Sequence, residues 1–126
     1  MEKQEIIKKL MEEERKVGLP VLLDYVFGRD IIVHTGIKYS DCEKSIDELN
    51  LSVRSQNALR RARIDTIGDL TDRLNAGTVK DIRNLGRKSY SEIQTKLLVY
   101  NYESMSDQRK YQFFEELIDF NIGRKQ

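Results

Sequence analysis

The sequence has little of what holds small proteins together through covalent links or metals. Its 126 residues include one cysteine, Cys42, and one histidine, which excludes an internal disulfide and a zinc site built from Cys and His. Tryptophan is absent, and no hydrophobic run approaches the ~20 residues that span a bilayer, so we expect no membrane partner. The amino terminus lacks the apolar segment and the small-residue cleavage site of a signal peptide, which favours a cytoplasmic protein.

Catalytic signatures are also missing. His34 has no carboxylate or cysteine near it in the sequence, and Cys42 lies between Asp41 and Glu43, a poor setting for a thiolate nucleophile. No carboxylate dyad and no nucleophile–base pair stands out. The sequence therefore predicts a protein that is not an enzyme, with no cofactor and no metal.

Charge is distributed unevenly along the sequence. Residues 51–100 hold 10 Lys and Arg against 5 Asp and Glu, a net charge of +5. Residues 1–50 hold 8 against 11, a net charge of −3, and residues 101–126 hold 4 against 5, a net charge of −1. This contrast indicates an anionic partner for the middle of the sequence, although a solvated arginine-rich helix face would give the same count.

Apolar residues recur at helical spacing near both termini. Residues 2–16 and 107–120 each carry such a stripe, which predicts an amphipathic helix at each end. The stripes are formed by Ile6, Ile7 and Leu10, and by Tyr111, Phe114, Leu117 and Ile118. Because an apolar stripe is costly to leave in water, we expect these two helices to pack together or to form a homodimer contact.

Residues 21–35 leave two alternatives open. The apolar run 21–28 fits either a short helix or a buried strand, whereas the β-branched run 31–35 favours a strand. In the second case Val21-Leu22-Leu23 and Ile31-Ile32-Val33 would pair as a small β-hairpin, after Gly18 and Pro20 end the first helix.

From residue 45 onward, signals for helix starts recur at short intervals. Ser45, Ser52 and Thr66 are suitable N-caps, and Ser106 can cap the last helix. The apolar-periodic segments are 53–64, 67–74, 79–84 and 88–100. This pattern predicts a mainly α fold, with a compact domain of four or five short helices and a helix on either side of it. The expected parts are 1–45, an amino-terminal helix with an irregular or β-like extension; 46–100, the central module; and 101–126, the carboxy-terminal helix.

The octapeptide 82–89, Ile-Arg-Asn-Leu-Gly-Arg-Lys-Ser, has the pattern of a helix-hairpin-helix. Gly86 can adopt a positive φ and lets a phosphate approach the main chain. The amides that follow it lie at a helix N-terminus, which favours an anion. Lys88 adds a positive charge and the Ser89 hydroxyl adds a donor. A helical hairpin that packs only for stability explains this octapeptide about as well as a phosphate site does. These residues alone therefore leave both alternatives open.

The middle of the sequence carries a longer set of landmarks: Leu51-Ser52-Val53-Arg54-Ser55 with Asn57 and Leu59, Ile67-Gly68-Asp69-Leu70, and Asn84-Leu85-Gly86 with Lys88-Ser89. Together they closely resemble one known family, the carboxy-terminal domain of the bacterial RNA polymerase alpha subunit. They occur in the family's order over about residues 46–100, with one extra residue near 75–77. Since 126 residues cannot also hold the subunit's assembly domain, we expect a standalone protein.

The resemblance implies an all-helical helix-hairpin-helix module that binds A·T-rich DNA across the minor groove. By position, Arg54 and Asn57 would enter or line the groove, and Gly86, Lys88 and Ser89 would contact the DNA backbone. The family also uses acidic residues before its first helix to touch a polymerase partner. Asp47 and Glu48 match that pair, but Asn50 stands where a third acidic residue is usual.

Three classes of function remain at this point. The first is a transcription-related DNA-binding accessory protein. The second is an adaptor that keeps the fold but binds a transcription factor or a polymerase component without DNA contact. The third is a subunit of a nucleic-acid enzyme, because nucleases and ligases also use helix-hairpin-helix units to grip phosphates. The presence of the DNA-contact residues favours the first class over the second, and the lack of a metal-ligand cluster disfavours the third.

Overall fold

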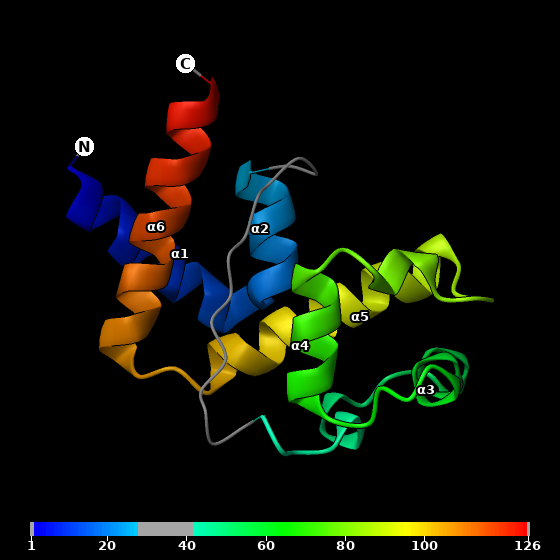
Figure 1. Ribbon diagram of the computed structural model, residues 1–126. Helices are drawn as coiled ribbons and strands as arrows, with labels where there is room; N and C mark the ends of the chain where they lie inside the picture. Colours follow the sequence, from blue (N-terminus) through cyan, green and yellow to red (C-terminus); the bar gives the residue numbers. More distant parts are fainter. Residues whose placement is uncertain (1, 28–41, 126) are drawn as a thin grey trace. The chain divides into compact units, whose positions relative to one another are not determined.

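The computed structural model describes residues 2–27 and 42–125 (Figure 1). The protein divides into two compact units, a central unit, Thr35–Asn101, and a terminal unit formed by Met1–His34 together with Tyr102–Gln126. Throughout the described ranges every regular element is a helix, and the only extended pairing is an isolated antiparallel bridge between Ser45 and Thr66. The predicted mainly α class is therefore confirmed.

Among its described residues the central unit has five helices, in agreement with the predicted four or five. They are the 3-10 helix η2 (Ile46–Leu49), α3 (Val53–Arg61), α4 (Ile67–Asn75), the 3-10 helix η3 (Val79–Asp81) and α5 (Arg87–Glu103), whose last two residues are counted with the terminal unit. The segment expected as a helix over 79–84 is thus shorter than predicted, because its helical turn ends at Asp81.

Capping hydroxyls explain where these helices begin. The hydroxyls of Ser52 and Thr66 each accept a hydrogen bond from the backbone N–H three residues later, at 3.3 and 3.0 Å. The Ser45 hydroxyl accepts one from the N–H of Asp47 at 3.1 Å. Each bond satisfies an amide that has no partner within its own helix. All three predicted caps of the central unit are confirmed, and Ser106 caps α6 in the same way, at 3.1 Å.

A single apolar core holds the central unit together. It collects one or two residues from each short helix, so that no helix is stable without the others. The fully or almost fully buried members are Ile46, Leu49, Leu51, Leu59, Ile64, Ile67, Leu70, Val79, Ile93 and Leu97. Each of these buried residues contributes roughly 1.5–3 kcal/mol to folding.

The described part of the terminal unit contains the helices α1 (Lys3–Val17), α2 (Leu19–Phe27) and α6 (Asp107–Lys125). Helix α1 packs against α6, which confirms the expectation that the two terminal helices pack together. Ile7 of α1 and Phe114 of α6 are fully buried. The rings of Tyr102, Phe113 and Phe114 form a cluster with centroid separations of 5.4–5.8 Å and tilted or edge-on contacts, a favourable aromatic geometry.

The prediction of a β-hairpin near residues 21–35 is wrong for its first strand. Residues 21–27 belong to α2, and Leu19, Leu22 and Leu23 of this helix are buried on one helical face. Gly18, with φ 87°, separates α2 from α1, and Pro20 lies in the first turn of α2, where a missing N–H costs little. The second strand, 31–33, lies outside the described residues. No helix in the described ranges is long and apolar enough to cross a membrane.

Candidate nucleic-acid interface

The first turns of α3 carry the two residues expected to enter a DNA groove. Arg54 and Asn57 are both exposed and lie three residues apart, so they share one face of the helix. Arg61 continues that face one turn later and donates from its Nε to the carbonyl oxygen of Asn57 at 3.3 Å. Arg54 makes no ion pair with any other described residue, so its guanidinium is available to a ligand.

The hairpin before α5 differs from expectation in which residue takes the left-handed conformation. Asn84 has φ 68°, whereas Gly86 does not have a positive φ. Asparagine tolerates this region better than most residues because its side chain can bond locally, so the turn does not need a glycine there. What Gly86 supplies is space: a Cβ built on it would meet no atom within 4 Å.

Helix α5 begins directly after this glycine, and its first amides have no partner within the helix. The first intrahelical bond runs from the N–H of Tyr90 to the carbonyl of Gly86 at 3.0 Å. The amides of Arg87, Lys88 and Ser89 therefore precede the helical ladder, and the helix dipole adds partial positive charge there. Arg87 and Lys88 are exposed, but Ser89 retains only 9% of its surface. The exposed anion-attracting groups are thus the two cations and the open glycine.

A carboxylate that the sequence analysis did not single out links these two sites. Glu92 of α5 accepts hydrogen bonds from the Ser52 amide at 3.0 Å, the Ser52 hydroxyl at 2.9 Å and the Ser55 hydroxyl at 2.5 Å. The bond from Ser55, followed by those from Ser52, holds the pKa of Glu92 below its ordinary value. The two serines flank Arg54, and Glu92 lies one helical turn after Lys88. This clamp therefore holds the start of α3 against the first two turns of α5.

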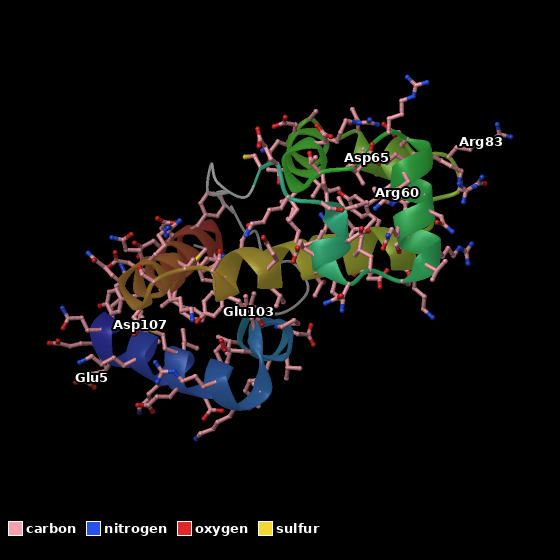
Figure 2. The ribbon with its side chains drawn as sticks, turned by 90° about the horizontal axis from the view of Figure 1, so that it is seen from below. Glu5, Arg60, Asp65, Arg83, Glu103 and Asp107 are labelled. Carbon is pink, nitrogen blue, oxygen red and sulfur yellow. The ribbon has the colours of Figure 1, made fainter. Side chains whose placement is uncertain are left out.

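The arrangement brings the predicted groove residues and the predicted phosphate site to the same part of the central unit. Side chains four residues apart on a helix are about 6 Å apart, so Lys88 lies about one turn from the carboxylate that holds Ser52 and Ser55. Arg83, on the hairpin itself, is exposed and extends away from the ribbon in Figure 2. The face is therefore cationic and open to solvent.

Not every arginine of the basic segment, residues 51–100, contributes to this face. Arg60 donates to the carboxylate of Asp47 at 2.7 Å and lies 3.5 Å from that of Asp65. The bond from Arg60 lowers the pKa of the Asp47 carboxyl, which also accepts from Gln56 at 2.5 Å. Both acidic residues expected to touch a protein partner are exposed, but Asp47 already bonds Arg60 and Gln56.

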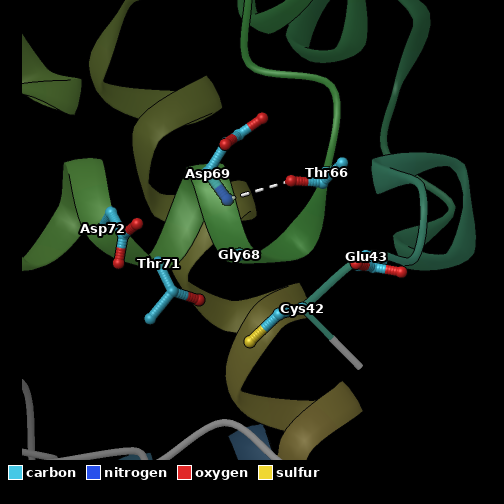
Figure 3. A pocket seen from close by; sticks show the side chains of 7 residues that line it. All are labelled: Cys42, Glu43, Thr66, Gly68, Asp69, Thr71 and Asp72. Carbon is cyan, nitrogen blue, oxygen red and sulfur yellow. Dashed lines mark hydrogen bonds between the residues drawn. The ribbon is translucent and has the colours of Figure 1, made fainter. Parts of the chain in front are cut away.

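The central unit also has a hollow of about 380 Å³, which lies at the start of α4 (Figure 3). Gly68 is required here, because its amide donates to the Cys42 carbonyl at 2.9 Å and a Cβ on it would lie 2.8 Å from that oxygen. Carboxylates of Glu43, Asp69 and Asp72 line the hollow. Among the described residues, however, no group of three or more His, Cys, Asp or Glu is placed to hold a metal ion. The contact at Gly68 therefore explains how the start of α4 packs against Cys42.

Comparison with known proteins places the middle of the sequence in a family. The family model for the carboxy-terminal domain of the bacterial RNA polymerase alpha subunit matches residues 37–98. Residues 37–98 belong to that family. The match spans η2 to most of α5, so the matched segment includes all of the residues placed on the cationic face.

The curated relatives are DNA-directed RNA polymerase alpha subunits. That of Leuconostoc mesenteroides subsp. mesenteroides is 59% identical over 56 residues, which is 44% of this protein and 18% of the relative. Those of Heliobacterium modesticaldum and Malacoplasma penetrans are 47% and 52% identical over 70 and 64 residues, or 54% and 51% of this protein. The matched part covers 22% and 19% of these two relatives. No solved structure gives a significant match.

Proposed function

We propose that the central unit binds double-stranded DNA, across the minor groove of A·T-rich sequence, in a transcription-related role. The observation that carries the proposal is the clamp at Glu92, which fixes a free arginine beside an open helix N-terminus within a domain of the polymerase alpha family. Arg54 and Asn57 would enter or line the groove. Gly86, Lys88 and Ser89 would hold a phosphate of the backbone.

The two halves of the site suit the two kinds of contact that DNA offers. The minor groove of an A-tract is narrow and strongly negative, which attracts an inserted guanidinium such as that of Arg54. Base edges in that groove distinguish little more than A·T from G·C. The α5 N-terminus offers amides, the helix dipole and Lys88, which suit a phosphate. Gly86 leaves room for that phosphate to reach the main chain, and the buried Ser89 would contribute through its amide rather than its covered hydroxyl.

The partners and location we propose follow from the same family membership. A non-catalytic accessory role in the cytoplasm fits, with RNA polymerase or a transcription factor as a protein partner in addition to DNA. Glu48 is the observation that favours such a protein contact, because it is exposed beside the internally paired Asp47. An adaptor that binds this partner without DNA contact is the second candidate function.

The test is a salt-dependent titration of the full-length protein against A·T-rich and G·C-rich duplexes. We expect Arg54→Ala to weaken binding to the A·T-rich duplex by about 1–3 kcal/mol and to reduce discrimination between the two duplexes. We expect Lys88→Ala to weaken both duplexes alike and to lower the salt slope by about one, as loss of a phosphate contact does. Lys8→Ala, outside the basic segment, is the control and should change neither quantity.

The two candidate functions give opposite results in this experiment. If Arg54→Ala binds A·T-rich DNA as well as the parent does, the groove assignment is wrong and the adaptor becomes the better proposal. If the parent binds neither duplex at low salt, the DNA proposal as a whole fails.

A further inference from the structure

An open apolar hollow of about 440 Å³ lies between α1 and α2 of the terminal unit, on helices that the proposed DNA site does not use. Its walls come from both helices, which join at Gly18 (Figure 1). The apolar lining includes Ile6, Leu10, Val17, Val21, Tyr25 and Val26. The hollow is therefore a groove in an amphipathic helix pair rather than a polar site for a small metabolite.

The groove concentrates most of the exposed large apolar side chains of the described residues. Of seven such side chains, five line it, with exposed fractions from 37% for Ile6 to 89% for Tyr25. The other two, on α3 and α6, do not line the groove. Exposed large apolar side chains that gather in one patch, rather than lying scattered singly, indicate an interaction surface. An exposed tyrosine at its edge is a common anchor residue in such surfaces.

Two charged residues in the groove indicate which partner it fits. Lys9 and Glu13 lie four residues apart on the same face of α1 and both line the groove. Glu13 also lies 3.4 Å from Lys16, an exposed pair that leaves its carboxylate open to a second cation. A partner of uniform charge would attract one of Lys9 and Glu13 and repel the other. A second α1 that crosses antiparallel, with a twofold axis near Met11, would place each Lys9 opposite the other copy's Glu13.

We infer that the α1–α2 groove is the contact surface of a homodimer, occupied by the same groove of a second copy of this protein. The interface is isologous, so the same residues meet on both sides and the Lys9–Glu13 pair forms twice around the axis. Exposed apolar side chains of α2, with Tyr25 as the anchor, are then removed from water. The inference does not depend on DNA binding, because none of these residues belongs to the central unit.

Sedimentation equilibrium of the full-length protein, over a wide range of concentration, tests the inference. The parent should dimerise reversibly. Lys9→Glu and Glu13→Lys should each raise the dimer dissociation constant about tenfold or more, because each places like charges opposite one another twice. The double variant Lys9→Glu with Glu13→Lys should return close to the parent value, because it restores both pairs with reversed sign. Tyr25→Ser should weaken the dimer without loss of helix by circular dichroism.

Lys8→Glu is the matched control, since Lys8 is exposed on the same helix but does not line the groove. It should leave the dissociation constant unchanged. A parent that stays monomeric at every concentration overturns the inference. So does a dimer that the single reversals do not weaken, or a double variant that does not recover, because self-association would then use another face.

Discussion

The clamp at Glu92 gives the sharpest prediction, because its removal should affect stability and DNA recognition in separable ways. Replacing Glu92 with Gln keeps the shape of the side chain but removes the charge and one acceptor. The carboxylate now accepts three hydrogen bonds, at 2.5, 2.9 and 3.0 Å, from two serines at the start of α3. A Gln amide has one oxygen, so the donor that faces its NH₂ group loses its partner.

The size of the effect follows from those three bonds. A hydrogen bond to a charged group contributes roughly 1.5–3 kcal/mol when well protected. Glu92 is partly exposed, and the Ser52 and Ser55 hydroxyls keep their own bond at 3.1 Å, so much less than the sum is lost. We expect Glu92→Gln to cost about 1 kcal/mol and Glu92→Ala about 2 kcal/mol of unfolding free energy. In a domain of this size, each kcal/mol lowers the melting temperature by about 4–8 °C.

DNA titration then separates the positioning role of Glu92 from its charge. If Glu92 only repelled phosphates, Glu92→Gln would bind every duplex more tightly. If it holds Arg54 beside Lys88, the variant should lose about tenfold in preference for A·T-rich over G·C-rich duplex, or ~1.4 kcal/mol. Tighter binding with preference intact, or unchanged urea midpoint and affinity, would refute the reasoning.

Three further predictions use the same urea unfolding and DNA titration. Gly68→Ala should destabilise the protein by about 1–3 kcal/mol, since its Cβ would lie 2.8 Å from the Cys42 carbonyl oxygen; an unchanged urea midpoint would contradict the close packing. Gly86→Ala should leave the unfolding free energy within about 1 kcal/mol yet weaken all duplexes, whereas Asn84→Ala should destabilise by about 1 kcal/mol because of its φ of 68°; the reverse order would move the strained position back to the glycine. The pKa of Glu92 is lowered on folding, so its stabilisation is complete above its unfolded pKa and is lost as pH falls through the folded one. The stability gap between parent and Glu92→Gln should therefore begin to narrow near the ordinary glutamate pKa of about 4.3 and narrow further as the pH falls, and a gap that stays constant down to pH 3 would count against the clamp.

The parts of the fold that depend on local sequence were predictable. Ser52 and Thr66 begin helices because a short hydroxyl side chain reaches an amide one turn later, and that geometry needs no information from elsewhere in the sequence. The terminal stripes were also predictable, since Ile7 and Phe114 belong to strongly periodic segments that become buried. The run 21–27 was not, because a short apolar stretch fits a buried strand and a helix equally well.

The helical hairpin before α5 is a second feature that the sequence alone did not predict correctly. Asparagine and glycine both tolerate a positive φ, and the pattern Asn84-Leu85-Gly86 contains one of each, so composition favours the glycine although the backbone bends at the asparagine. The distinction changes what Gly86 is for. A glycine that adopts a positive φ is needed for the fold. A glycine with an ordinary φ and open space beside it is one that a ligand can approach.

The third limit concerns charge and long-range contacts, and it bears most directly on function. A net charge of +5 over residues 51–100 treats all its arginines as equivalent. Arg60 is held by Asp47, and the Nε of Arg73 donates to the Thr78 hydroxyl at 2.7 Å, so both stabilise the domain. Among the described residues Arg54 makes no ion pair, and the serines that flank it are held by Glu92, which is distant in the sequence. The arginine expected to enter the groove is therefore one that pairs with no described carboxylate, and the residue that holds the start of its helix is an anion.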